Sequence, residues 1–380
     1  MAVRVERVEG RRGVSRFIDV AWRVQAGRGT PWVPPLRAMV RDTLDTKGNP
    51  FYRDADLALF IATREGRPVG RIAAIENRWH NRHHGDRVGF WGFYECLDDP
   101  EASSALFAAA EAWLMDRGLD RSRGPMSPSM NHECGLLVGG YETRPSVMTP
   151  WNPPYLGELV ERSGYAKAQD LVGYWIPAAG ERALPERVGV LAERTRRKTG
   201  VTFRRLDVKT MEREARMVLE LYKQAWENNW GFVPPSWEEF WHTAKDLKMV
   251  LAPELSFVAE TDEGVVGFML IIHDLNRVLQ HIPSGRLWPW NLVRLLTATR
   301  RFVAGRVILL GLTREYRNRG LFPLFAYEAA RLGREIGCDG AEASWILDDN
   351  EGMTAPLEAM GLEVTKRWRI YEKTIGAQAS

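Results

Sequence analysis

The strongest chemical signal in the chain is a basic, glycine-bearing turn between an apolar strand, predicted over 306–312, and a helix, predicted over 321–336. Exposed backbone N–H groups and the positive end of a helix favour a bound anion. Gly320 lets the backbone approach a ligand closely. We therefore predict a phosphate-binding turn, with an ordinary turn of a flavodoxin-like sheet as the alternative. The predicted residues are Leu312, Thr313, Arg314, Arg317, Asn318, Arg319, Gly320, Leu321 and Phe322.

The turn and the residues after it resemble the GCN5-related N-acetyltransferase (GNAT) superfamily. The family pattern is Arg/Gln-X-X-Gly-X-Gly/Ala, then an Asn eleven residues before a Gly-Phe; here Arg317-X-X-Gly320-X-Phe322 precedes Asn350 and Gly361-Leu362. The resemblance implies acyl-CoA as co-substrate, with its pyrophosphate on the backbone amides from Arg317 to Leu321. It also implies that Asn350 contacts the pantetheine arm.

Two positions depart from the family pattern. Phe322 replaces a small residue, so the turn is expected to be wider. Leu357 stands where many members carry a tyrosine that protonates the leaving thiolate. We therefore expect that acid to be absent or supplied elsewhere, with Tyr316 and Tyr371 as weak candidates.

An aromatic-Val-Pro-Pro signature occurs twice, at 32–35 and at 232–235, which indicates that one fold was used twice. We predict an α/β fold of two tandem GNAT-like domains with mixed sheets, over 1–178 and 179–376. In the first copy Asp98 and Asp99 precede the predicted helix, where they cap it and repel phosphate. The first domain should therefore lack a CoA site, and the acceptor is expected near the interface of the copies.

Four further segments make the resemblance more specific. Over nearly the whole chain they resemble a bacterial family of tandem acetyltransferase-fold proteins that includes the bacterial ceramide synthases. The resemblance implies an acyl-CoA-dependent N-acyltransferase that acylates a long-chain or sphingoid-type amine. The segments are Trp32-Val33-Pro34-Pro35-Leu36, Gly124-Pro125 with Gly135, Asn152-Pro153-Pro154-Tyr155, and Asn229-Trp230-Gly231-Phe232-Val233-Pro234.

Acylating an amine needs a base, because an ammonium is not a nucleophile. Two pairs are candidates: His273-Asp274 at a strand end, and His132-Glu133 in a Gly/Pro-rich stretch, with a loop held by side-chain hydrogen bonds as the alternative. His80–His84 reads as a polar loop, and we expect no metal. The acceptor amine is predicted to lie between the first two helices of the second copy, with a helix C-cap and core aromatics as the alternative. The predicted substrate-binding residues are Glu227, Asn228, Asn229, Trp230 and Tyr155.

Gln280–Arg301 combines tryptophans, leucines and arginines, which suits a bilayer surface or a long acyl chain. A helix packed on the other domain is the alternative.

Bulk composition limits the choice of function. The chain has 380 residues and a net charge of +3, too small to indicate nucleic-acid binding. Three widely spaced cysteines favour a reducing compartment. No signal peptide and no membrane-spanning run are recognisable, so a cytoplasmic enzyme is expected, with peripheral contact at the inner membrane left open. An aminoacyl-tRNA-dependent transferase and a catalytically inactive GNAT-fold binding protein remain the alternatives.

Overall fold

The computed structural model describes residues 2–25, 29–178, 184–298, 302–317 and 319–376. The chain divides into two compact units that interleave along the sequence. The first contains the residues up to Asp170, Leu279–Trp288 and the chain from Trp368 onward. The second contains Leu171–Val278 and Pro289–Arg367.

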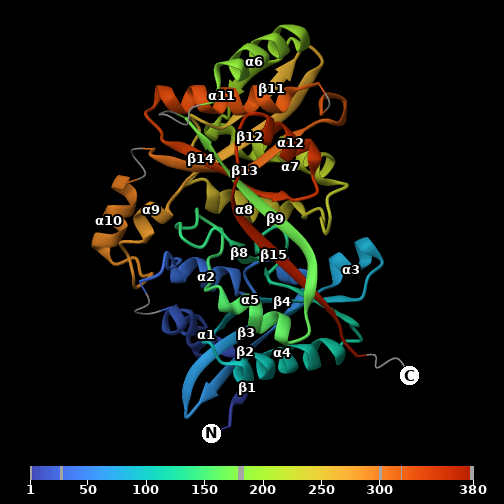
Figure 1. The fold of residues 1–380 in the computed structure, drawn as a ribbon, viewed down its shortest axis with the longest axis vertical. Coiled ribbons are helices and arrows are strands. Elements are labelled where there is room, and N and C mark those ends of the chain that lie inside the picture. The colour runs from blue at the N-terminus through green and yellow to red at the C-terminus, as the bar shows by residue number, and fades with distance from the viewer. Residues whose placement is uncertain (1, 26–28, 179–183, 299–301, 318, 377–380) are drawn as a thin grey trace. The chain divides into compact units, whose positions relative to one another are not determined.

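The first unit has a mixed sheet with strand order β1-β2-β3-β4-β5-β15. Its helices α4 and α5 pack on this sheet through an apolar core that includes Trp91, Leu106 and Leu156 (Figure 1). The elements that begin in this unit are β1 Arg4–Val8, α1 Gly10–Gln25, α2 Arg37–Thr43, β2 Ala55–Arg64, β3 Arg67–Asn77, α3 Arg78–His84, β4 Val88–Cys96, α4 Pro100–Met115, β5 Arg121–Gly124, β6 Met126–Ser127, β7 Glu133–Cys134, β8 Leu136–Gly139, α5 Tyr155–Arg162 and β9 Ala166–Pro177.

The second unit repeats the plan, with strand order β9-β14-β13-β12-β11-β10. One face of its sheet packs against α11 through Phe325, and the other against α7 through Tyr222. Its elements are α6 Glu186–Thr199, β10 Thr202–Arg205, α7 Met211–Trp226, α8 Trp237–Leu247, β11 Phe257–Thr261, β12 Gly264–His273, α9 Asn276–Leu279, α10 Pro289–Ala298, β13 Ala304–Leu312, α11 Leu321–Glu335, β14 Gly340–Leu347, α12 Glu351–Ala359 and β15 Val364–Thr374.

The last strand of each repeat completes the sheet of the other repeat. Strand β9, green in Figure 1, pairs antiparallel with β14 over Leu171–Pro177. Strand β15, red in Figure 1, pairs antiparallel with β5 over Tyr371–Thr374. The chain therefore passes from one compact unit to the other inside these two strands. The division at residue 178 concerns the repeats rather than these units, and it stays a prediction.

In the first unit the parallel strands β4 and β5 pair only over Val88–Phe90 and Arg121–Arg123. The space where they part is filled by the chain's own β6 segment. The Ser127 hydroxyl accepts a hydrogen bond from the Phe93 amide at 2.9 Å. A Cβ atom at Gly92 would lie 1.8 Å from the Met126 carbonyl oxygen, so only glycine fits there.

Ser236 and Glu239 form a complete capping box at the start of α8, a local signal that the sequence carries. His80–His84, expected to form a polar loop, instead belongs to helix α3, which Asn77 caps and Gly85 ends. The Gly/Pro-rich stretch around His132 and Glu133 contains the short strands β6, β7 and β8, whose pairing is not visible in local periodicity.

We predict that Asp99→Ala lowers the free energy of unfolding by about 1 kcal/mol, because Asp99 caps α4 through the Ala102 amide at 3.1 Å. Hydrogen bonds from Arg64, and then the backbone bond from Ala102, hold the pKa of Asp99 below its usual value. The stabilisation is therefore present above the carboxyl titration range and is lost as the pH falls through the lowered pKa.

Urea denaturation at several pH values measures this effect. Asp98→Ala is the matched control, since Asp98 is exposed and does not cap the helix. Equal losses in the two variants, or an Asp99→Ala effect that does not shrink at low pH, would contradict the assignment.

Candidate functional site

The predicted anion-binding turn lies at the N-terminus of α11. Gly320 is the N-cap residue and has φ of 74°, a left-handed conformation that favours glycine. No side chain in the described residues caps this helix end. The N–H groups of Gly320, Leu321 and Phe322 therefore stand at the positive end of a fifteen-residue helix. Asn318, also predicted here, lies outside the described residues.

Side chains around the turn fix its position against α7. Arg317 donates hydrogen bonds to the carbonyl oxygens of Leu312, at 3.4 Å, and Gln224, at 2.6 Å. Arg319 places its guanidinium 4.6 Å from the centre of the Tyr316 ring. Thr313 precedes the single helical turn Arg314–Tyr316. Its backbone amide donates a hydrogen bond to the carbonyl oxygen of Val266 in β12. The turn is thus tied to a strand and to a helix.

The predicted acceptor loop is joined to this turn. Arg314 forms an ion pair with Glu227 at 2.7 Å, although both side chains are more than half exposed. Glu227 follows α7, and Asn228, Asn229 and Trp230 continue the loop. The Asn229 amide donates to the Trp226 carbonyl, as expected of a chain leaving a helix end. Two groups of residues that are 87 positions apart in sequence are therefore neighbours.

The strand before the turn separates from its parallel neighbour. β13 pairs with β14 over Ala304–Val307 and Gly340–Ala343, and in the described part of the chain this pairing ends there. β13 then continues to Leu312 and β14 to Leu347. Only Asp348–Asn350 lie between β14 and α12, so no segment like β6 follows in this unit.

Asn350 and Leu357 lie on α12, which follows β14. Asn350 is the N-cap residue, and its side chain makes no capping hydrogen bond. Its backbone carbonyl accepts from the Met353 and Thr354 amides, so the side chain is not needed to begin the helix. Leu357 is fully buried. The position where family members carry an acid is thus part of the hydrophobic core here.

A buried polar network, which sequence reasoning missed, lies where β13 and β14 begin to part. Arg306 donates to the Ser344 hydroxyl and carbonyl, both at 3.1 Å. The Ser344 hydroxyl donates to Glu342 at 2.8 Å, and Lys366 lies 3.7 Å from the same carboxylate. All four residues are at least 95% buried. Charged residues at inward positions of apolar strands were the signal available in the sequence.

This network faces the α7 side of the sheet. Val307 and Ala343, one residue along from Arg306 and Glu342, pack in the core with Phe325 of α11. Side chains alternate between the faces of a strand, so Arg306 and Glu342 point to the opposite face. The acceptor loop after α7 belongs to that same side.

The predicted bases lie elsewhere. His273 pairs with Gly305, at the end of β13 opposite to the turn, and burial lowers its pKa. The Asp274 side chain is largely enclosed beside it and accepts a hydrogen bond from the Asn276 amide. His132 and Glu133 belong to the first unit, where His132 shares a 2.8 Å hydrogen bond with Ser129.

The other tyrosines singled out in the sequence are engaged in structural contacts. Tyr155 opens α5 in the first unit and donates to the Cys96 carbonyl at 3.0 Å. Tyr371 donates to Glu161 at 3.3 Å, and burial raises the pKa of its phenol. Tyr316 is buried within the turn.

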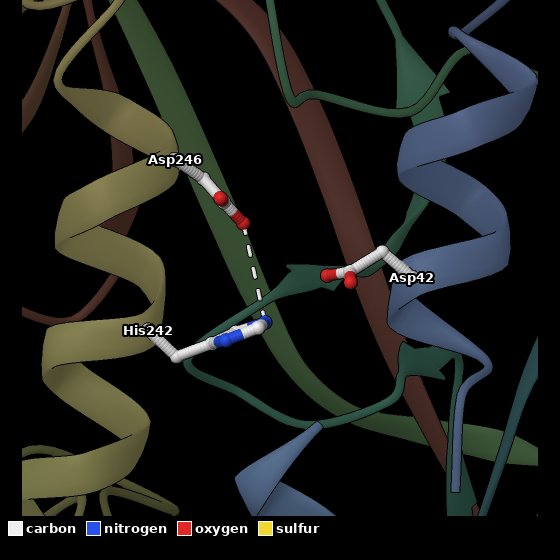
Figure 2. Close-up of side chains that lie close together, drawn as sticks. All are labelled: Asp42, His242 and Asp246. Carbon is white, nitrogen blue, oxygen red and sulfur yellow. Dashed lines mark ion pairs between the residues drawn. The ribbon is translucent and has the colours of Figure 1, made fainter. Parts of the chain in front are cut away.

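Helix α8 carries His242 and Asp246 one turn apart, with 4.0 Å between the imidazole nitrogen and the carboxylate (Figure 2). Asp42, also drawn in Figure 2, belongs to α2 of the other compact unit.

Two curated proteins are similar to this chain over most of its length. The bacterial ceramide synthase of Caulobacter vibrioides is 34% identical over 371 residues, which cover 95% of each chain. Protein YghO of Escherichia coli K12 is 33% identical over 354 residues, covering 90% of this chain and 88% of that protein. No family model matches the chain.

Solved structures share the fold at low sequence identity. A tandem GNAT protein from the clavulanic acid biosynthesis pathway has a TM-score of 0.61 and 13% identity, over 99% of this chain and 100% of that one. A GCN5-related N-acetyltransferase from Sphaerobacter thermophilus has a TM-score of 0.53 and 15% identity, over 100% and 97%.

Fold and comparisons define the class: the protein is an acyltransferase of the tandem GNAT fold. Within that class, the chain belongs to the family of the bacterial ceramide synthase. The fold class and the family predicted from the sequence are confirmed.

We predict that Glu342→Ala lowers the free energy of unfolding by about 3–5 kcal/mol, because it removes the buried carboxylate that accepts from Ser344 and pairs with the buried cation Lys366. Urea denaturation measures the loss. Glu363→Ala, at an exposed position of the same unit, is the control and should change stability by less than about 0.5 kcal/mol. Similar values for both variants would show that the network does not stabilise the fold.

Proposed function

We propose that this protein transfers an acyl group from acyl-CoA to the amine of a long-chain, sphingoid-type base, forming an amide and free CoA. One observation carries the proposal. An uncapped helix N-terminus with a left-handed glycine directly follows a strand that has parted from its parallel neighbour. The helix N-terminus suits a diphosphate. The parted strand leaves backbone groups that can bind an extended pantetheine arm.

The residues of the second unit fit acyl-CoA. The N–H groups of Gly320, Leu321 and Phe322 would hold the diphosphate; Pro323 supplies none. The Asn350 side chain makes no capping hydrogen bond to its own helix, so its side-chain amide is suited to bind the pantetheine arm. In the first unit Asp99 occupies the corresponding helix end and Ser127 the strand edge, which supports a single CoA site per chain.

The amine must lose a proton before or during its attack on the thioester carbonyl. We propose that Glu342 accepts this proton through the Ser344 hydroxyl, with Arg306 holding that hydroxyl in place. The new C–N bond forms as the C–S bond breaks, and CoA leaves as the thiolate. Backbone N–H groups of β13 beyond Val307 are suited to stabilise the oxyanion. Catalytic roles for His273, Asp274, His132 and Glu133 stay predictions.

We expect the purified protein to release free thiol from palmitoyl-CoA in the presence of a sphingoid amine, and much less from acetyl-CoA. A thiol-reactive chromophore measures the rate, and mass spectrometry identifies the amide. Ser344→Ala should lower kcat at least tenfold with little change in KM for acyl-CoA, since it interrupts the proton path.

Other outcomes of this assay would favour other functions. Equal rates with both donors would indicate acylation of a small molecule. Acyl-CoA binding without thiol release from any amine would support a binding protein. Transfer only from aminoacyl-tRNA would support the alternative transferase.

We predict that Gly320→Asp weakens CoA binding at least tenfold while the protein stays folded. Aspartate tolerates the left-handed conformation, and a Cβ atom there has room, since it would lie 3.6 Å from Thr195 Oγ1, an ordinary van der Waals distance. Its carboxylate would repel the diphosphate, as Asp99 does in the first copy.

Gly320→Asn is the matched control, because it adds the same shape without the charge. Isothermal titration calorimetry with CoA compares the two, and thermal unfolding verifies the fold. Equal CoA affinity in the two variants would mean that the diphosphate binds elsewhere.

A further inference from the structure

Helix α10, Pro289–Ala298, exposes its apolar side chains and buries few of them. Trp290 is 84% exposed, Val293 and Leu296 are each 53% exposed, and Leu292 is 42% exposed. Leu295 is buried and anchors the helix. Trp288, just before the helix, is 63% exposed. Scattered exposed hydrophobic residues are common, but a contiguous set on one short helix indicates a binding surface.

The exposed residues form one face of α10. Trp290, Val293 and Leu296 follow one another at intervals of three residues, and Leu292 adjoins Leu296 across one turn. At 100° per residue they cover an arc of about 160°. Leu295 lies outside that arc. The helix is therefore amphipathic with its apolar face outward, the reverse of a helix that packs on its own core.

The chain around this face is strongly basic. Between Asp274 and Glu315 the sequence contains no aspartate or glutamate. The same stretch carries arginines at 277, 286, 294, 300, 301, 306 and 314. Of these, Arg286 and Arg294 flank or belong to α10, and both are exposed. The face thus combines apolar area with positive charge and with tryptophans, which favour the boundary between water and lipid.

We propose that α10 docks this face on an anionic lipid bilayer, lying in the plane of the surface. The charge argues for this occupant: a second copy of the chain would bring like charges together, whereas acidic headgroups complement them. The helix has ten residues, far fewer than the roughly 20 that cross a bilayer. No helix among the described residues is long and apolar enough to span a membrane.

This surface gives the proposed reaction access to its acceptor. A long-chain amine partitions into bilayers, so an enzyme that acylates it gains by working at the lipid surface. This step rests on the proposed function, but the docking itself does not. Chain docking and chemistry can therefore be tested separately.

Vesicle flotation tests the docking. The full chain should float with vesicles of phosphatidylglycerol and phosphatidylcholine, less with phosphatidylcholine alone, and less again at high salt. Val293→Glu/Leu296→Glu should lower the bound fraction at least tenfold. Val190→Glu/Leu191→Glu, on α6, is the matched control, because those side chains are 58% and 48% exposed. Circular dichroism verifies that both double variants fold.

Flotation of the α10 variant equal to that of the control variant would overturn the proposal. The proposal would also be overturned if the wild-type protein did not bind anionic vesicles, or if sedimentation velocity showed that it forms dimers through α10. A water-soluble short-chain amine separates the two hypotheses: the α10 variant should acylate it at the wild-type rate and lose activity only on amine held in vesicles. Vesicle binding without any acyl transfer would leave the docking intact and refute the proposed reaction.

Discussion

The site depends on one constraint, the early end of pairing between the parallel strands β13 and β14. A parallel ladder normally satisfies the N–H and C=O groups of both strands. Here the ladder ends at Val307 and Ala343, and the five residues of β13 that follow lead directly into the turn before α11. A strand edge with available backbone groups is thereby followed along the chain by the positive N-terminal end of a helix. An extended ligand with an anionic end matches that arrangement.

In the first unit the parallel strands also part early, but the chain itself bonds to the strand edge that this exposes. Its strands β4 and β5 part after three paired residues, but the chain returns to fill the space with Met126 and Ser127. A side chain, Asp99, also caps the helix that follows. The difference between the two copies is therefore local: thirty residues separate β5 from α5, whereas three separate β14 from α12.

Exchange of the last strands ties the two repeats together. Strand β14 of the second unit would be an open edge without β9, and β5 of the first would lose β15. Open edges are unstable and prone to aggregate. Either repeat expressed alone, cut near residue 178, would lose the strand that the other repeat contributes to its sheet. This explains why two boundaries of the compact units lie inside β9 and β15 rather than at the end of the first repeat.

What the sequence could predict was local in character. The turn before α11 and the aspartate cap of α4 each depend on residues within a few positions of one another. The Arg306–Ser344–Glu342 network depends on residues 36 to 38 positions apart, brought together by parallel pairing, and no local periodicity marks it. The exchange of β9 and β15 was invisible for the same reason. The roles of the site residues stay predictions, because the fold positions them without testing them.

The buried Leu357 bears on whether the reaction needs a dedicated acid. This position supplies no acid, since it holds a leucine that is fully enclosed in the core. In the tetrahedral intermediate, however, the two candidate leaving groups differ strongly in basicity. A thiol has a pKa of about 8.5 and an alkylamine about 10.4. Once the amine has given its proton to a base, the thiolate is the better leaving group, and it can depart unprotonated near neutral pH. In the proposed reaction the essential proton transfer is then removal from the amine, so the proposed base Glu342 would matter more than a replacement for the missing tyrosine.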